Sequence, residues 1–302
     1  MRLSADTIQH VCTAYVTRRR QGKKLKLTWR SRTRSLGWIP FKAAYIRLHG
    51  DTVTYCGQRF RLWLSRPVEG VVKTGSFTQD ARGRWYVNFQ CEVADLVEPI
   101  GHLDLGIALG LKSQIACSDG RVYRRDTLTR AYEDTLAMAQ RGHKNRRIKA
   151  IQAKIANTRS DWTHKATTAI AKRAKLLVIG EVSSAKLIKT PFATSIHDAA
   201  WHSVRHQLTY KATRLAGGCV PGREMFSSVT CSDCGTRSGP SGLSALGVRE
   251  WCCSACGVWH DRDVNAARNI LRTGRGTPTK GILALEGGED VNTHAARPTS
   301  GS

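Results

Sequence analysis

Four cysteines in two pairs form the clearest chemical pattern of the sequence. Two residues separate Cys231 from Cys234, two separate Cys253 from Cys256, and eighteen lie between the pairs. Each pair can direct two thiolates to one side of a tight turn, and two such turns complete the tetrahedral four-sulfur shell that Zn²⁺ prefers. Cys252 is a competing ligand, although only Cys253 keeps the two-residue spacing to Cys256. We therefore predict a closed zinc site with a structural role.

Three carboxylates stand in local contexts that could hold a second kind of metal. Asp104 interrupts an apolar run, Glu181 follows the apolar stretch 176–180, and Asp263 lies at the start of a helix expected to close at Gly274. Carboxylates at strand ends and a helix start can converge on two Mg²⁺ ions, which activate water and stabilise the leaving oxygen in phosphodiester hydrolysis. Ordinary roles stay open as well: solvation of a strand end for Asp104 and Glu181, and an N-cap for Asp263.

Basic residues are in large excess and are concentrated in two blocks. Lys and Arg number 48 against 23 Asp and Glu, a formal net charge of +25. Residues 1–50 hold twelve basic residues against Asp6 alone, and residues 141–175 hold eleven against Asp161 alone. Either block by itself fits a solvated face. Two of them favour a polyanion partner, because Lys and Arg gain affinity by releasing counterions from nucleic acid. The candidate nucleic-acid contacts are Arg18, Arg19, Arg20, Lys23 and Lys24 in the first block and Lys144, Arg146, Arg147 and Lys149 in the second.

The sequence argues against a membrane protein. Its apolar stretches are a few residues long, well short of the roughly 20 residues needed to span a bilayer. A membrane surface stays open as a partner of the basic blocks, but neither block has the pattern of a strong amphipathic anchor. The first residues lack the charged-then-apolar order of a signal peptide, so we expect a cytoplasmic protein. Ten cysteines in such a reducing compartment favour metal binding over disulfides.

The elements that would position these residues begin with a basic, mostly β module over residues 1–98. Alternating apolar and polar residues predict a hairpin that pairs 44–49 with 52–55. A second pairing is expected between 73–78 and 85–93, where apolar residues recur at every second position.

After this module the pattern changes to that of a layered α/β domain. The expected elements are strands at 102–106 and 113–118, a long helical stretch over 127–175, a buried strand at 176–180, and a helix opened by a capping box at 195–198 with Trp201, Val204, Leu208 and Leu215 on one face. Residues 275–302 are rich in Gly, Thr, Pro and Ser, a composition typical of disorder.

Six of these segments, taken in chain order, resemble the transposon-encoded TnpB (OrfB) family, whose members are relatives of the type V CRISPR effector nucleases. The segments are 103–106, 178–182, 208–211, 227–235, 253–257 and 261–270, the last of which reads Asp-Arg-Asp-Val-Asn-Ala-Ala-Arg-Asn-Ile. The resemblance covers about residues 70–274, and its most specific part is the pair of cysteine turns followed by this last segment.

The resemblance implies an α/β chain with an RNase H-like, RuvC-type nuclease domain, an inserted zinc ribbon and a small, mostly β module in front. It makes Asp104 the first RuvC acid, Glu181 the second and Asp263 the third, with Asp261 as the near alternative for the third. The implied domains are a partial wedge or recognition module at 1–98, a nuclease domain at 99–226 and 258–274, a zinc ribbon at 227–257, and a tail at 275–302.

The activity implied by the resemblance is RNA-guided cleavage of DNA. A guide RNA pairs with target DNA, structural Zn²⁺ holds the ribbon, and catalytic Mg²⁺ serves the RuvC acids; members are often labelled transposases. Only about a hundred residues precede Asp104, fewer than in full-length members, so we expect a minimal or N-terminally truncated chain. A non-catalytic RNA-guided DNA-binding regulator and a truncated remnant are the alternatives.

Overall fold

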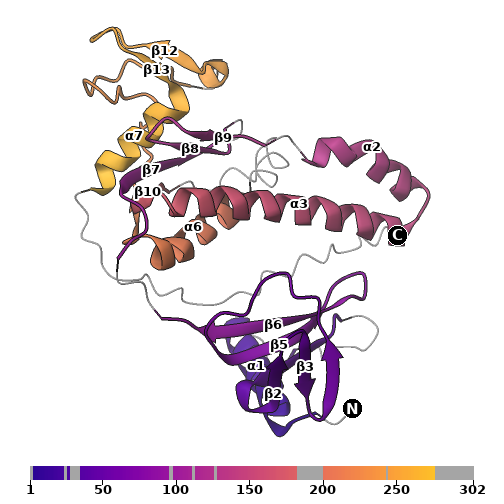
Figure 1. The fold of residues 1–302 in the computed structure, drawn as a ribbon. Coiled ribbons are helices and arrows are strands. Elements are labelled where there is room, and N and C mark those ends of the chain that lie inside the picture. Colours follow the sequence, from indigo (N-terminus) through magenta and orange to yellow (C-terminus); the bar gives the residue numbers. More distant parts are fainter. Residues whose placement is uncertain are drawn as a thin grey trace. The chain divides into compact units, whose positions relative to one another are not determined.

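The computed structural model describes residues 3–23, 26–27, 35–94, 98–110, 113–125, 128–181, 200–242 and 244–275. These residues divide between two compact units, one ending before residue 95 and one beginning after it (Figure 1). No helix in these ranges combines the length and apolar character needed to cross a membrane.

The first unit consists of a helix and two small antiparallel sheets. Its elements are α1 (Ala5–Gln21), β1 (Trp38–Lys42), the short 3₁₀ helix η1 (Ala43–Tyr45), β2 (Ile46–His49), β3 (Thr52–Tyr55), β4 (Gln58–Arg61), β5 (Val71–Gln79) and β6 (Trp85–Glu92). One sheet has the order β1-β5-β6 and the other β2-β3-β4. Phe41, Val53 and Tyr55 are fully buried between them. Both predicted strand pairings are confirmed, as β2 with β3 and as β5 with β6.

Helix α1 was not predicted, and it contains three arginines of the first basic block. Ser4 caps its start by accepting a hydrogen bond from the backbone N–H of Thr7. Asp6 lies in the first turn and three arginines lie in the last, an order of charges that stabilises a helix dipole. The side chains of Arg18, Arg19, Arg20 and Lys23 are exposed there, whereas Lys24 lies outside the described residues.

The second unit is built on one five-stranded sheet. Its strands are β7 (Leu103–Leu109), β8 (Ile115–Cys117), β9 (Val122–Tyr123), β10 (Ala174–Gly180) and β11 (Cys219–Gly222), in the order β11-β10-β7-β8-β9. The first three are antiparallel neighbours, and β10 runs parallel to both β7 and β11. The strands expected near 102–106, 113–118 and 176–180 are therefore confirmed, although β10 begins two residues earlier than predicted.

Helices cover both faces of this sheet (Figure 1). They are α3 (Asn145–Ala171), α6 (Trp201–Leu215) and α7 (Arg262–Gly274), whereas α2 (Leu128–Arg141) packs against α3. Leu105 and Ile107 point to the face covered by α3 and α6, and Ala108 points to the face covered by α7. Because side chains alternate along a strand, Asp104 lies on the α7 face of β7.

The helical stretch predicted over 127–175 is two helices. It breaks between α2 and α3, where His143 takes a positive φ of 49°, and α2 folds back so that Ala139 packs with Ile151 and Ile155. Helical periodicity continues on both sides of this turn, which is why the break was missed. The four basic side chains predicted here as nucleic-acid contacts, Lys144, Arg146, Arg147 and Lys149, are exposed around the start of α3.

The remaining predictions concern segments that the structure describes only in part. The predicted helix is confirmed as α6, with Trp201, Val204 and Leu208 buried and Leu215, its last residue, half-buried. Its predicted capping box at 195–198 lies outside the described residues, and so does the stretch from residue 276 to the end.

Candidate functional site

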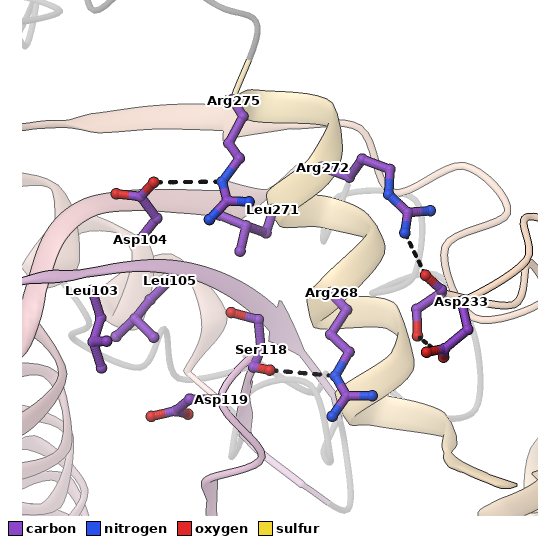
Figure 2. Close-up of a pocket in the computed structure, with 11 residues that line it drawn as sticks. Leu103, Asp104, Leu105, Ser118, Asp119, Asp233, Arg268, Leu271, Arg272 and Arg275 are labelled. Carbon is purple, nitrogen blue, oxygen red and sulfur yellow. Dashed lines mark hydrogen bonds and ion pairs between the residues drawn. The ribbon is translucent and has the colours of Figure 1, made fainter. Parts of the chain in front are cut away.

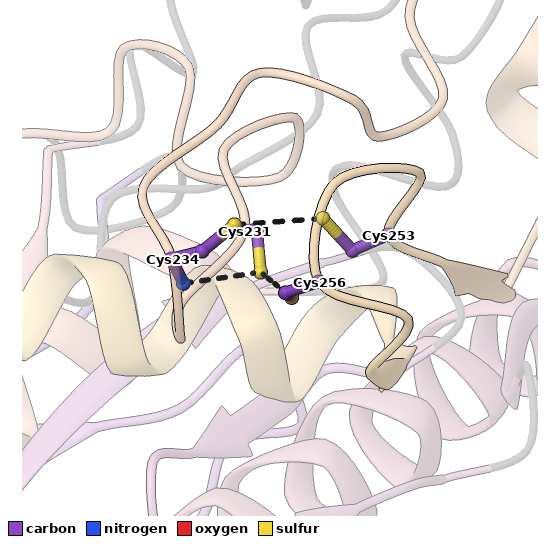
Figure 3. A group of neighbouring side chains, drawn as sticks. All are labelled: Cys231, Cys234, Cys253 and Cys256. Carbon is purple, nitrogen blue, oxygen red and sulfur yellow. Dashed lines mark hydrogen bonds between the residues drawn. The ribbon is translucent and has the colours of Figure 1, made fainter.

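The four predicted cysteine ligands meet at one point. The Sγ atoms of Cys231, Cys234, Cys253 and Cys256 all lie within 4.8 Å of one another (Figure 3). Cys231 and Cys256 are 3.7 Å apart and Cys234 and Cys253 are 3.6 Å apart. A tetrahedron with metal–sulfur bonds of about 2.3 Å has sulfur–sulfur edges of about 3.8 Å, so the four thiols fit a Zn²⁺ ion. Cys252 stays outside this group and donates from Sγ to the carbonyl of Gly257 at 3.3 Å.

Local backbone geometry explains how the two cysteine turns form. Gly235 and Gly257 follow the pairs with positive φ values of 81° and 73°, which glycine adopts without a Cβ clash. Their N–H groups donate to the carbonyls of Cys231 and Cys253 at 3.0 and 2.8 Å. Hydrogen bonds lower the pKa of the Cys253 thiol to about 6; the largest contribution comes from the Ser238 hydroxyl, 3.1 Å from the sulfur, and the backbone N–H groups of Cys256 and Ala255 also contribute. These contacts favour the thiolate that a metal ion requires.

Hydrogen bonds from two asparagines of α7 attach the first cysteine turn to this helix. The side-chain amide of Asn265 donates to the carbonyls of Ser227 and Thr230 at 3.1 and 2.8 Å. Asn269, one helical turn later, donates to the same two carbonyls at 2.9 and 2.7 Å. Asn265 also accepts from the backbone N–H of Ser232 at 2.8 Å. The four-residue spacing of the two asparagines is the sequence signal that could have revealed this attachment.

The structure separates the roles of the two aspartates at the start of α7. Asp261 is the N-cap, and its side chain accepts from the backbone N–H groups of Asp263 and Val264, both at 2.9 Å. The N-cap role left open for Asp263 therefore belongs to Asp261. The Asp263 carboxylate instead faces Arg249, whose Nη1 lies 3.4 Å from Oδ1.

Asp104 lies in a cleft of about 570 Å³ between β7 and α7 (Figure 2). Its Oδ2 is 3.4 Å from Nε of Arg275, at the end of α7. Gly106, two residues later, permits this packing, because a Cβ there would lie 2.1 Å from the carbonyl oxygen of Ala267. The cleft is lined by Leu103, Asp104, Leu105, Ser118, Asp119, Ser232, Asp233, Arg268, Leu271, Arg272 and Arg275.

Three exposed arginines of α7 border this cleft, and sequence reasoning did not single them out. Arg268, Arg272 and Arg275 recur about once per helical turn and line the cleft together with Asp104. Arg268 donates to the carbonyl of Ser118 at 3.5 Å, and Arg272 donates to that of Ser232. Each guanidinium carries five N–H donors, so the row retains donors for an anion in the cleft.

Glu181 lies apart from Asp104. It follows β10, is exposed, and donates its backbone N–H to the carbonyl of Gly222 at 3.2 Å. Asp104 is in register with Leu176, five residues before Glu181, which corresponds to about 16 Å along the strands. Among the described residues, carboxylate oxygens of the three predicted acids do not gather within 4.8 Å. This arrangement does not fit a pair of Mg²⁺ ions about 4 Å apart, so we derive no metal-assisted step from it.

A fourth carboxylate, Glu224, was missed by sequence reasoning. It lies two residues beyond β11, and a Cβ on Gly180 would come within 2.2 Å of its Oε1. Burial raises the pKa of Glu224 to about 7; Arg205 opposes this shift and Glu181 adds to it. Because β10 and β11 are parallel, both end at the same edge of the sheet. An acid within two residues of the end of each strand is the signal that could have paired Glu224 with Glu181.

Comparison with known proteins finds similarity to proteins described as RNA-guided DNA endonucleases and to a related family model. A family model described as "Cas12f1-like, TNB domain" matches residues 201–270. A candidate RNA-guided DNA endonuclease of Streptomyces pristinaespiralis is 35% identical over 226 residues, covering 70% of this chain and 55% of that protein. InsQ of Escherichia coli K12, described in the same terms, is 29% identical over 253 residues, covering 74% and 62%.

The chain thus spans 55% and 62% of the lengths of these two relatives. Among solved structures, a cryo-EM complex of Cas12f1 with single guide RNA and target DNA aligns with a TM-score of 0.44 and 16% identity. That alignment covers 81% of this chain and 68% of the other.

Proposed function

Since this chain belongs to the TnpB family of transposon-encoded nucleases, we propose that it is an RNA-guided DNA endonuclease that hydrolyses DNA phosphodiester bonds. Its partners are a guide RNA and a target DNA. Base pairing with the guide supplies most of the sequence specificity, and the protein supplies a basic surface and the cutting site.

The observation that carries this proposal is the position of α7. This one helix packs over the strand of Asp104, has Asp263 in its first turn, and holds the first cysteine turn through Asn265 and Asn269. A sheet of three antiparallel strands followed by two parallel ones, with helices on both faces, supports an RNase H-like, RuvC-type domain. We assign this domain to residues 99–226 and 258–274, the zinc ribbon to 227–257, and the first module to 1–98.

Asp104, Glu181 and Asp263 are the proposed catalytic acids, and Glu224 is a further candidate beside Glu181. Mg²⁺ is the ion that we propose for catalysis, although Asp104, Glu181 and Asp263 do not gather in this structure at the distances that a pair of such ions requires. Structural Zn²⁺ is the proposed occupant of the four-cysteine shell. The exposed arginines of the cleft and the basic blocks on α1 and at the start of α3 are the proposed contacts to nucleic-acid phosphates.

The test uses the full chain purified with its co-expressed RNA. The bound RNA is sequenced, and DNA complementary to it is offered with Mg²⁺. We expect a cut product that Asp104→Ala abolishes. Asp161→Asn removes an exposed carboxylate that pairs with Lys165 on α3, and this control should cut like the parent. Absence of cleavage, or cleavage unaffected by Asp104→Ala, contradicts the proposal.

A non-catalytic, RNA-guided DNA-binding protein is the second candidate. The observation that favours it is the separation of Asp104 from Glu181 along the parallel strands. It predicts tight binding of complementary DNA that depends on the copurified RNA, with no cut product in Mg²⁺. A gel therefore distinguishes the two candidates: both bind the DNA, and only the nuclease gives a shorter DNA product.

A further inference from the structure

His260 is buried against the cysteine cluster, although it belongs to neither cysteine pair. It lies on β13 (Trp259–Asp261), which pairs with β12 (Glu250–Cys252) so that His260 faces Trp251. The centroids of these two rings are 4.7 Å apart, and only 4% of His260 is exposed. Its Nε2 lies 3.1 Å from Sγ of Cys231, which is itself fully buried.

The chemistry of the sulfur fixes the direction of this hydrogen bond. A metal-bound thiolate has no proton to give, so the proton must be on Nε2 of His260. The other polar atom near Nε2 is Oδ2 of Asp233, at 3.7 Å, beyond hydrogen-bond distance. Nδ1 of His260 is buried without a hydrogen-bond partner among the described residues. With the proton on Nε2, Nδ1 is an acceptor. The buried atom without a partner is therefore an acceptor rather than an N–H donor.

The Cys231 thiolate needs such a donor. Its fully buried position keeps water away, and an unsolvated thiolate is costly unless hydrogen bonds compensate it. The backbone N–H groups of Asp233 and Cys234 approach Sγ at 3.4 and 3.5 Å. His260 adds a shorter contact from a side chain. Partners of this kind orient metal ligands and tune how strongly they bind.

His260 also stands directly before the N-cap of α7. The next residue, Asp261, accepts the N–H groups of Asp263 and Val264. We propose that His260 is a positioning residue that donates to the metal-bound Cys231 thiolate and thereby couples an occupied zinc shell to the first turn of α7. Asn265 and Asn269 attach the same cysteine turn to α7 further along the helix. A bound metal ion therefore fixes α7 at two places, at its first turn through His260 and at these two asparagines.

The test compares two substitutions in the full chain. His260→Gln keeps an N–H donor near the position of Nε2, and His260→Leu keeps an apolar side chain without a donor. Zinc affinity is measured by competition with a chromophoric chelator. We expect His260→Leu to bind Zn²⁺ about 10- to 100-fold more weakly and His260→Gln to recover most of the loss. Trp259→Ala, at a side chain on the same strand that is 71% exposed, is the control and should bind like the parent.

Two further readouts connect the metal to α7 and do not depend on nuclease activity. Hydrogen exchange at the amides of Asp263 and Val264 should speed up on zinc removal and in His260→Leu, while the amide of Val178 in β10 changes less. Co²⁺-loaded parent and variants should share the absorption bands of a four-thiolate site. A spectrum in which His260→Leu loses a nitrogen ligand would make His260 a ligand and overturn the proposal.

Unchanged zinc affinity in His260→Leu also overturns the proposal. If His260→Leu does not fold, the parent and His260→Gln decide the matter. The proposal then stands if zinc removal from both speeds exchange at Asp263 and Val264 more than at Val178, and it falls if exchange there is insensitive to zinc.

Discussion

Asp104 and Arg275 form an ion pair, 3.4 Å between Oδ2 and Nε, that joins the start of β7 to the end of α7. The two side chains are 32% and 59% exposed, so solvent screens their attraction and an isolated pair of this kind contributes about 0–1 kcal/mol. The carboxylate in this pair, that of Asp104, is the one proposed as the first catalytic acid.

Arg275→Gln should therefore change the free energy of unfolding by less than about 1 kcal/mol. Urea unfolding monitored by circular dichroism measures this change. A loss of several kcal/mol would mean that Arg275 makes a structural contribution beyond the pair with Asp104. Arg223→Gln, at an exposed arginine just beyond β11, is the matched control for the removal of one surface charge.

Local sequence patterns predicted the parts of this protein that depend on neighbours in the chain. The two cysteine turns depend only on the spacing of the cysteines and on the glycine after each pair. Both turns are present in the structure. The hairpin of β2 with β3 follows from alternation around the Gly50-Asp51 turn, and α7 ends at Gly274 as expected.

The parts that could not be predicted depend on register between distant segments. Asp104 lies on a strand and Glu181 directly follows one, as expected, but only the pairing of Asp104 with Leu176, five residues before Glu181, shows that the two acids lie apart along the strands. Glu224 was missed because its neighbour Gly180 lies over forty residues away in the chain. The turn at His143 was missed for a local reason, since the helical period is the same on both sides.

Gly106 should tolerate no side chain, because α7 rests directly on it. A Cβ there would meet the carbonyl oxygen of Ala267 at 2.1 Å, and backbone cannot swing aside as a flexible side chain can. Gly106→Ala should therefore destabilise the protein by about 1–3 kcal/mol, as overpacking of a core does. Thermal unfolding measures the effect. Gly247→Ala, where a Cβ would meet nothing within 4 Å, is the control, and equal stability of the two variants would contradict the packing described here.

The arginine row on α7 should contribute to binding of nucleic acid through phosphates. Each contact between a basic side chain and a phosphate releases counterions, which for single strands changes the slope of log affinity against log salt by about 0.7. The double variant Arg268→Gln, Arg272→Gln should weaken binding of a single-stranded DNA oligonucleotide and make its salt slope shallower by about 1.4. Fluorescence anisotropy at several salt concentrations measures the slope.

Arg262→Gln is the matched control for this double variant. Arg262 belongs to the same helix, but it donates to the carbonyl of Ala245 at 2.7 Å and does not line the cleft. It should leave the salt slope unchanged. A double variant with the parent's slope would remove the arginine row from the proposed nucleic-acid surface.

Glu224 should make the stability of the protein fall as the pH rises from about 4.5 to about 7. Burial raises the pKa of this carboxyl to about 7 in the folded protein, from the 4.5 of an unperturbed glutamate. Below the lower value both states hold the proton, and the folded state keeps its full advantage. Between the two values the unfolded chain releases the proton first, so ionisation favours unfolding until the folded carboxyl also ionises.

Glu224→Gln stays neutral throughout and should remove this part of the pH dependence. The free energy of unfolding is measured at several pH values between about 5 and 7.5, with the variant's curve subtracted from the parent's. Glu250→Gln, at an exposed glutamate on β12, is the control and should leave the parent's curve unchanged. A ¹³C NMR titration of the Glu224 carboxyl locates its midpoint directly, and a midpoint near that of an exposed glutamate would show that Glu224 is not buried beside Gly180.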